Sequence, residues 1–177
     1  MQRFSDHFEE NIRLMQTIFE REDTFHIRFV KNRHHPQVPI AICFFDSMVD
    51  GTMLARDVAG PLTERPFNCK AKDLSKEIAQ AVLSASSQDF SDQTDKVCIQ
   101  IASGDCAVFT GDCPSAIILD IKGMQQRGIE QPDGVVSVAG PHEGFNENIM
   151  HNLSLIKKRL CSPNFKAEFV KLGQQSH

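Results

Sequence analysis

The sequence predicts an α/β protein of two small subdomains, and three observations support this prediction. Residues 38–45 are apolar at odd and even positions alike, which is typical of a strand covered on both faces in a largely parallel sheet. Apolar residues recur at helical spacing in residues 5–23 and 73–85. Short apolar segments separated by Gly-Asp pairs in the second half indicate an antiparallel meander. We therefore expect a first subdomain with a largely parallel sheet and helices, and a second in which a long helix covers a meander.

The first helix and the first strand open the N-terminal subdomain. Ser5 is a suitable N-cap for a helix that ends near Asp23. The buried side of this helix is predicted to carry Phe8, Ile12, Met15 and Phe19. Residues 24–30 then alternate apolar and polar, which favours a strand with one solvated face.

Asp46 directly follows the apolar strand at residues 38–45. Carboxylates at this end of a parallel strand often face a ligand crevice, although a cap or turn acceptor is the simpler interpretation. A short helix is predicted at residues 52–58. A further helix is capped by Asp73 and buries Leu74, Ile78, Ala81, Val82 and Ala85.

Residues 84–95 are rich in Ser and Asp and poor in apolar residues, which favours a linker. We place the linker at residues 88–95, between a first subdomain at 1–87 and a second at 96–177. The meander strands are predicted at residues 97–101, 106–110 and 116–121, with further strands at 135–138 and 165–170.

A tight turn and a long helix end the second subdomain. Gly140, Pro141 and Gly144 break regular structure, so a tight connection is expected there. Asn146 is the predicted N-cap of a helix that runs to Leu160, with Phe145 packed on Met150. The face predicted to pack on the sheet carries Ile149, Leu153, Ile156 and Leu160.

Composition excludes several classes of protein. A net charge of −4 and a pI near 6.0 provide no general attraction to nucleic acid. The two basic clusters, at residues 31–35 and 157–159, are short and are typical of a solvated loop and a helix end. The six cysteines show no CxxC or metal-binding spacing, which fits free thiols, and we expect no metal and no cofactor. No apolar run approaches the ~20 residues of a membrane helix, so we expect a soluble piece.

The chain offers only fragments of catalytic chemistry. Walker loops, HExxH and Gly-x-Ser-x-Gly are absent from the sequence. His142 and Glu143 are neighbours and Cys161 lies one helix away, but spacing alone does not bring a nucleophile and a base together. We therefore expect no enzyme, with a hydrolase using Cys161 or Cys106 as a third hypothesis. The turn before the long helix is better suited to binding or coupling.

The run GPHEGFNENIMHNLSLIKKRL, residues 140–160, resembles the signature of the A-subunit family of bacterial spore germinant receptors, the GerA-type proteins. That family carries a Gly-Pro-Arg-Glu-Gly-Phe-Thr-Glu turn followed by Asn-x-x-Leu-Ile-Arg-Arg-Arg. The segments Phe45–Asp50, Ser103–Asp105 and Asp120–Gly123 resemble further family motifs in the same order, and the similarity covers nearly the whole chain. Where the family has charged residues, this chain has Gln131, Val135, Ala139 and His142, so its turn carries fewer charges.

The resemblance implies the N-terminal domain of a germinant receptor A subunit, on the cytoplasmic, spore-core side of the inner spore membrane. It implies B and C subunits as partners, membrane helices beyond this chain, and nutrient sensing or signal coupling during germination. The alternative is an assembly domain that docks subunits without binding a nutrient. Arg127, Glu143, Asn152 and Arg159 are expected either to form a polar lock that braces the turn or to pass a signal. The candidate ligand-binding or coupling residues are Asp46, Arg127, Gly140, Pro141, Glu143, Gly144, Phe145, Asn152 and Arg159.

Overall fold

The structure, a computed structural model, describes residues 2–83, 88–111, 113–123 and 145–170. Its strands form one sheet in the order β1-β2-β4-β5-β3, and all neighbouring pairs are antiparallel. The strands are β1 (Phe25–Val30), β2 (Ile40–Phe45), β3 (Gln88–Ser91), β4 (Cys106–Thr110) and β5 (Ala116–Leu119). The helices are α1 (Phe8–Ile18), α2 (Gly51–Met53), η1 (Leu54–Ala59), α3 (Gly60–Glu64), α4 (Leu74–Ala81), α5 (Thr94–Ala102) and α6 (Ile149–Leu160).

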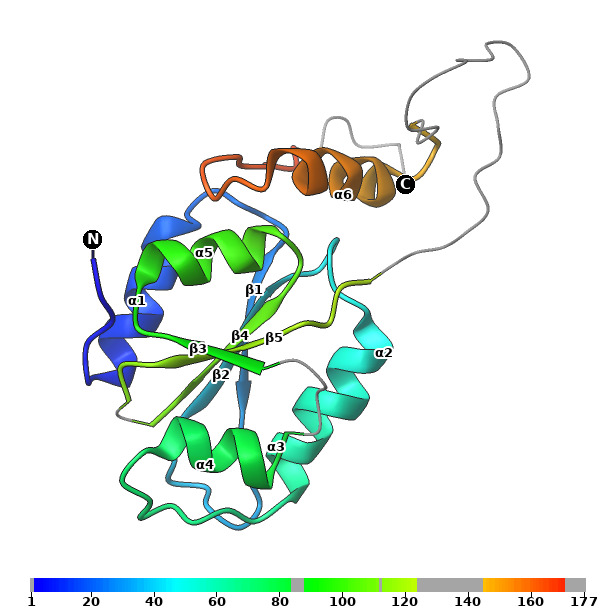
Figure 1. Ribbon diagram of the computed structural model, residues 1–177. Coiled ribbons are helices and arrows are strands. Elements are labelled where there is room, and N and C mark those ends of the chain that lie inside the picture. Colours follow the sequence, from blue (N-terminus) through cyan, green and yellow to red (C-terminus); the bar gives the residue numbers. More distant parts are fainter. Residues whose placement is uncertain (1, 84–87, 112, 124–144, 171–177) are drawn as a thin grey trace.

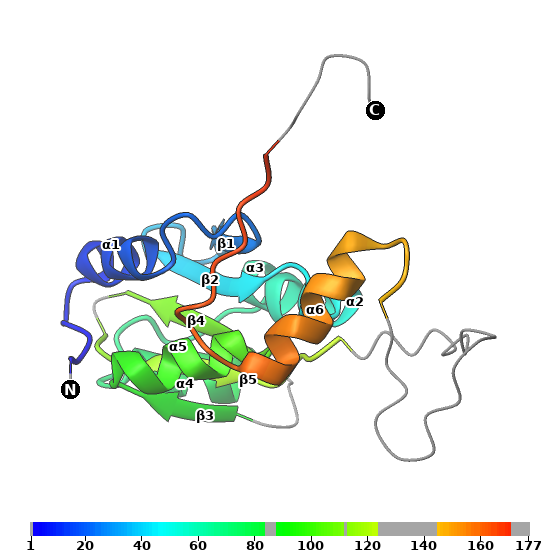
Figure 2. The same cartoon turned by 90° about the horizontal axis from the view of Figure 1, so that it is seen from above.

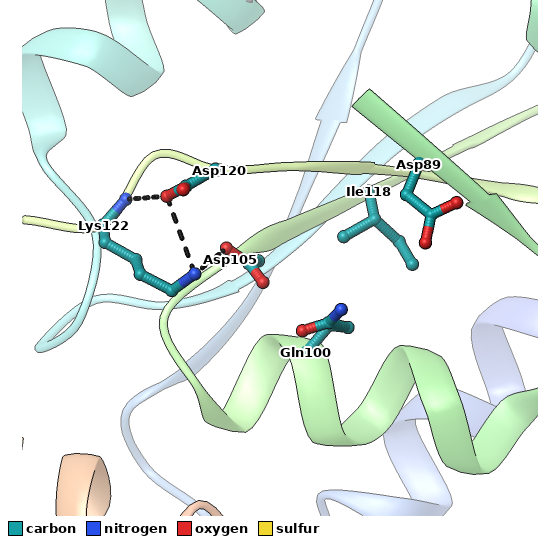
Figure 3. A pocket seen from close by; sticks show the side chains of 6 residues that line it. All are labelled: Asp89, Gln100, Asp105, Ile118, Asp120 and Lys122. Atoms are coloured by element: carbon teal, nitrogen blue, oxygen red, sulfur yellow. Dashed lines mark hydrogen bonds and ion pairs between the residues drawn. The ribbon is translucent and has the colours of Figure 1, made fainter. Parts of the chain in front are cut away.

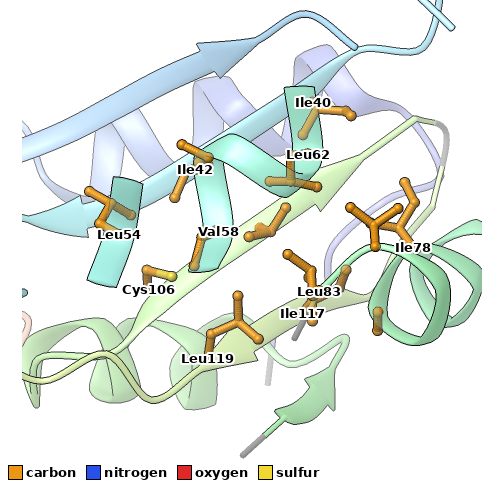
Figure 4. Close-up of a cluster of buried hydrophobic side chains, with 14 of the residues drawn as sticks. Ile40, Ile42, Leu54, Val58, Leu62, Ile78, Leu83, Cys106, Ile117 and Leu119 are labelled. Atoms are coloured by element: carbon orange, nitrogen blue, oxygen red, sulfur yellow. The ribbon is translucent and has the colours of Figure 1, made fainter. Parts of the chain in front are cut away.

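Helices cover both faces of the sheet (Figures 1 and 2). One face packs against η1, α3 and α4, and Figure 4 shows the apolar side chains that meet there. The other face packs against α1 and α5. Odd and even residues of β2 therefore both enter apolar clusters, and all six residues of this strand are buried. The fold is a mixed α/β structure in three layers.

The prediction of a largely parallel sheet is wrong. β2 runs antiparallel to β1 and to β4, with Ile42 opposite Arg28 on one side and opposite Val108 on the other. Cover on both faces makes a strand apolar at every position whatever its direction. The apolar pattern of β2 indicates that both faces of the strand are buried, but it does not indicate the direction of the neighbouring strands.

The predicted linker and the first predicted meander strand also have different structures. Residues 88–91 form β3, which pairs with β5, and α5 starts at Thr94. Strands from both predicted subdomains thus share one sheet, with β2 between β1 and β4. The strand expected at residues 97–101 lies inside α5, because Val97, Cys98, Ile101 and Ala102 are buried at helical spacing.

Other predictions are confirmed. α1, β1, β2 and the β4–β5 hairpin are present, although α1 ends at Ile18 rather than near Asp23 and its N-cap is His7, not Ser5. The Asp73 side chain caps α4 by accepting a hydrogen bond from the Lys76 amide at 3.2 Å, but Ala81, predicted as buried, is exposed. The short helix expected at residues 52–58 is longer, since α2, η1 and α3 run without a break from Gly51 to Glu64. Residues 165–170 form no strand, and residues 135–138 lie outside the described residues. In the described ranges no helix has the length and apolar character needed to cross a membrane.

Candidate functional site

Three of the sequence motifs meet at one end of the sheet. The turn after β2, residues 46–50, lies beside residues 120–123 at the exit of β5. Main-chain hydrogen bonds join them, from the Asp50 amide to the Ile121 carbonyl and from the Gly123 amide to the Met48 carbonyl, both at 2.9 Å. Residues 103–105, between α5 and β4, contact both segments. We call these three segments the motif junction.

Two glycines make the motif junction possible. Gly104 has a φ of +99°, and a Cβ atom there would lie 3.2 Å from Cγ of Lys122 and 3.3 Å from the Met48 carbonyl oxygen. A Cβ atom on Gly123 would lie 2.9 Å from the carbonyl carbon and oxygen of Val49. The three segments are therefore packed backbone against backbone, with no room for a side chain at either glycine.

An ion pair closes the motif junction. Nζ of Lys122 lies 2.8 Å from Oδ1 of Asp105 and 3.7 Å from Oδ1 of Asp120. Asp105 is only 4% exposed, and burial raises its pKa above the usual value although Lys122 partly offsets this effect. Burial would lower the pKa of Lys122, yet the two carboxylates raise it overall. The pair thus ties the exit of β5 to the start of β4.

A small hollow of about 150 Å³ opens beside this ion pair (Figure 3). Gln100 of α5 and Asp89 of β3 face the Asp105–Lys122 pair across it. Pockets for small molecules usually measure ~300 Å³ or more. The hollow is therefore small for a nutrient, and its carboxylates are partly neutralised, since Lys96 pairs with Asp89 at 2.6 Å.

A second hollow, of about 180 Å³, lies between the motif junction and the start of α6. It is lined by Asp46, Ser47, Asn148, Met150 and His151. Oγ of Ser47 is buried and has no hydrogen-bond partner among the described residues. We call this space the α6 hollow; it places the candidate Asp46 directly beside the helix that follows the predicted turn.

The N-terminus of α6 differs from its prediction. Asn148, not Asn146, is the N-cap, and its side chain accepts a hydrogen bond from the His151 amide at 3.1 Å. Asn146 instead pairs with Asn152: the Asn146 amide donates to Oδ1 of Asn152 at 2.8 Å, and Nδ2 of Asn152 donates to the Asn146 carbonyl at 2.6 Å. Phe145 is 70% exposed, so the expected packing of its ring on Met150 is not confirmed.

The other candidate residues are only partly placed. Arg127, Gly140, Pro141, Glu143 and Gly144 lie outside the described residues. Arg159 is exposed and forms no ion pair with a described residue, while Asn152 holds the turn at Asn146. The structure brings Asp46 to α6, and the polar lock remains a prediction because two of its four members are not described.

The strongest polar contact of α6 was not predicted. Nζ of Lys157 lies 2.9 Å from Oε1 of Glu22, 2.8 Å from Oγ1 of Thr24 and 3.7 Å from the ring centre of Phe45. Lys157 is 4% exposed, and the Glu22 side chain is fully buried. The sequence signal was the position of Lys157, four residues after the buried Leu153 and so on the same helix face. We call this cluster the Lys157 clamp.

Burial and the neighbouring groups shift the pKa values of both charged residues of the Lys157 clamp. Burial would raise the pKa of Glu22, but hydrogen bonds from Thr24, Lys157 and the Ala167 amide lower it overall. Burial lowers the pKa of Lys157 below its usual value in spite of Glu22. A buried charge is costly without its partner, so either residue alone would be strongly unfavourable here.

The segment after α6 is bound to the same corner of the molecule. The Ala167 amide donates to Oε2 of Glu22 at 2.8 Å, and the Asp23 amide donates to the Ala167 carbonyl at 2.9 Å. Arg21 and Glu168 form an exposed ion pair at 2.8 Å. The turn between α1 and β1 therefore holds both α6 and the chain that follows it.

The described residues offer little for catalysis. Cys106 is buried and burial raises the pKa of its thiol, which argues against a nucleophile. Cys161 is exposed, and its Sγ donates to the Lys158 carbonyl at 3.0 Å rather than to a base. Within the described ranges, no three His, Cys, Asp or Glu side chains are grouped to hold a metal.

Comparison with known proteins shows the family of this chain. The family model described as Bacillus/Clostridium GerA spore germination protein matches residues 13–177. Spore germination protein KA of Bacillus subtilis (strain 168) is 25% identical over 147 residues, which are 83% of this chain and 27% of that protein. Uncharacterized membrane protein YfkQ of the same organism is 28% identical over 138 residues, 76% of this chain and 27% of that protein. The chain thus spans about a quarter of the length of these curated relatives.

The fold is also found in a solved structure. It is the crystal structure of the N-terminal domain of the A subunit of the Bacillus megaterium spore germinant receptor GerK3. The TM-score is 0.65 at 16% sequence identity, and the match covers 99% of this chain and 63% of that chain. At this identity the likeness concerns the fold.

Proposed function

Because this chain belongs to the GerA family of spore germination proteins, we propose that it acts in spore germination as the N-terminal part of a germinant receptor A subunit. The family match over residues 13–177, the relatives and the shared fold support this proposal. Its role there is to couple a nutrient signal to the rest of the receptor. The partners are the B and C subunits, and the site of action is the inner spore membrane, with this part on the spore-core side.

The observation that carries the coupling role is the Lys157 clamp. α6 buries only Leu153, Leu155 and Lys157, and Lys157 is held by one carboxylate, one hydroxyl and one aromatic ring. Such a polar contact has a defined geometry and is lost as a unit when one partner moves. α6 is therefore an element that can occupy a bound and a released position, which signal coupling requires.

The α6 hollow lies at the other end of the same helix and gives the coupling an input. A ligand or a subunit that occupied the space between Asp46 and His151 would favour one position of α6 over the other. In this proposal Asp46 and Asn152 act at the described part of the site, together with Arg127, Arg159 and the turn of Gly140, Pro141, Glu143, Gly144 and Phe145. Calorimetry of the purified chain with amino acids, sugars and nucleosides tests direct nutrient binding, and absence of heat with all three would exclude it.

Germination of spores carrying two variants of the full-length receptor tests the coupling role. Lys157→Met leaves the buried Glu22 carboxylate without its cation. Glu22→Gln combined with Lys157→Met removes both charges, so no unpaired charge remains buried. If α6 couples the signal, the double variant recovers folding stability but germinates poorly in response to nutrient. Recovery of germination together with stability would show that the clamp is architecture only.

An assembly role is the second candidate, and a separate observation favours it. Ile149 and Leu160 of α6 are 64% and 53% exposed, although the sequence predicted both as buried. Exposed apolar side chains on one helix are typical of a subunit contact. Ile149→Gln with Leu160→Gln should then reduce recovery of the A subunit with its B and C partners, while unchanged recovery would exclude this surface.

A further inference from the structure

The outer edge of β1 has no strand beside it in the part of the chain that the structure describes. β1 stands at the end of the strand order and pairs only with β2 among the described residues. The Asp46 amide donates to the Thr24 carbonyl at 3.0 Å. This bond shows which residues of β1 direct their main-chain N–H and C=O groups toward β2 and which direct them outward. The main-chain groups of His26 and Arg28 therefore face β2, and those of Ile27 and Phe29 face outward. Among the described residues, the outward main-chain groups of Ile27 and Phe29 have no hydrogen-bond partner, so they can pair with another strand.

The side chains of β1 are also incompletely covered. Phe25 and Ile27 are half-buried against the α1 face of the sheet, and Phe29, which follows on the same face, is 63% exposed. Edge strands usually carry polar or charged residues at such positions, because an exposed apolar edge invites pairing. A strand added beside β1 would continue this face and cover Phe29.

The charged side chains of β1, of β2 and of the segment that joins them are all basic. Residues 24–45 contain no Asp or Glu, although the whole chain has a net charge of −4. Arg28 and Lys31 are exposed and form no ion pair with a described residue, whereas Arg33 pairs with Glu64 at 2.7 Å. His26 shares the opposite face of β1 with Arg28. The edge is therefore apolar on one face and cationic on the other.

We propose that β1 is a docking edge for a strand of a partner protein in which acidic and apolar residues alternate. The period of two places the apolar residues of that strand beside Ile27 and Phe29 and its carboxylates beside His26 and Arg28. A second copy of β1 would instead bring like charges together. An anionic lipid surface would meet the charge but would leave the outward main-chain groups without strand pairing.

The complete chain, labelled for NMR, is titrated with a capped peptide of about eight residues that alternates Glu and Val. We expect the largest shifts at the amides of Ile27 and Phe29, whose N–H groups face outward. A peptide of the same composition in blocked order, and one that alternates Lys and Val, serve as controls. Equal binding of all three peptides, or shifts away from β1, would overturn the proposal.

Substitutions then assign the contact. Arg28→Glu should weaken binding of the acidic peptide about tenfold, because a cross-strand attraction becomes a repulsion. Phe29→Thr should also weaken binding of this peptide, although Thr still favours a strand. Arg13→Glu on α1 and Ile99→Thr on α5, which is 48% exposed, are matched controls that should leave binding unchanged. Two results would overturn the assignment to a partner strand. One is binding of phosphatidylglycerol vesicles through Arg28 without peptide binding, and the other is self-association of the chain that is lost in Phe29→Thr.

Discussion

The sheet body and α6 are held by different forces. In the body, apolar clusters on both faces of the sheet enclose side chains such as Ile42 and Phe109, which are at most 1% exposed. α6 leaves Ile149 and Leu160 largely in solvent and buries only Leu153 and Leu155 besides the Lys157 clamp. Apolar burial is non-directional and tolerates small displacements, whereas a buried ion pair depends on its geometry. From this difference we expect that α6 can be released without unfolding the sheet.

The largest effect should come from the body. Phe109→Ala removes a ring that is 1% exposed and packs edge-on against Phe4, with the ring centres 5.0 Å apart. We expect a loss of about 3–5 kcal/mol in the free energy of unfolding, because the site cannot collapse to fill the cavity. Urea unfolding followed by circular dichroism measures this loss. A loss below that of any α6 variant would contradict the contrast between the two regions.

The motif junction should behave like the body. Gly123→Ala forces a Cβ atom to within 2.9 Å of the Val49 carbonyl group, and we expect a loss of about 1–3 kcal/mol from this overpacking. Gly51→Ala is the matched control, since a Cβ atom there meets nothing within 4 Å. Thermal unfolding compares the melting temperatures of the two variants. Equal melting temperatures would mean that the motif junction can shift to accommodate the added Cβ atom.

Acid should loosen α6 selectively. The folded-state pKa of Glu22 is lowered, so its stabilising contribution is present above its ordinary pKa of 4.5 and is lost as the pH falls through the lowered value. The pKa of Asp105 at the junction is raised, so its protonation on acidification stabilises the fold. Protection factors of α6 amides should therefore fall below pH 4.5 while those of β4 persist. The Glu22→Gln variant should lack this step in α6, and its presence there would assign the step to another group.

The smallest effect should come from the exposed side of α6. Ile149→Gln changes a side chain that is 64% exposed, and the free energy of unfolding should shift by less than about 0.5 kcal/mol. Leu153→Gln, at 8% exposure on the same helix, is the internal comparison and should cost more. A large loss for Ile149→Gln would show that this position is covered in solution.

Local patterns in the sequence were sufficient for some elements and insufficient for others. The cap at Asp73 and the stripe of α1 depend on neighbouring residues, and both were predicted correctly. Residues 97–101 are apolar enough for a strand or a helix, and only packing against β2 and β4 selects the helix. The relative direction of two strands depends on residues that are distant in the sequence. A local pattern therefore could not show whether the sheet is parallel or antiparallel.

The candidate site shows the same division. The motifs at residues 46–50, 103–105 and 120–123 were recognised as separate segments, and their meeting at one end of the sheet required the fold. The Lys157 clamp joins residues 135 positions apart, Glu22 and Lys157, and a lysine within a basic run is usually solvated. Its spacing from Leu153 places Lys157 on the buried face of α6, but no local pattern indicated that Glu22 would be its partner.

Hydrogen exchange of α6 tests the central claim, that the Lys157 clamp holds this helix to the sheet independently of the core. Amide protection is compared in the unmodified chain, in Lys157→Met and in Glu22→Gln with Lys157→Met. We expect Lys157→Met to abolish protection in α6 while β2 and β4 keep theirs, and the double variant to recover protection in α6 because no unpaired charge remains buried. Equal loss of protection in α6 and in the strands, or unchanged protection of α6 in Lys157→Met, would contradict the account.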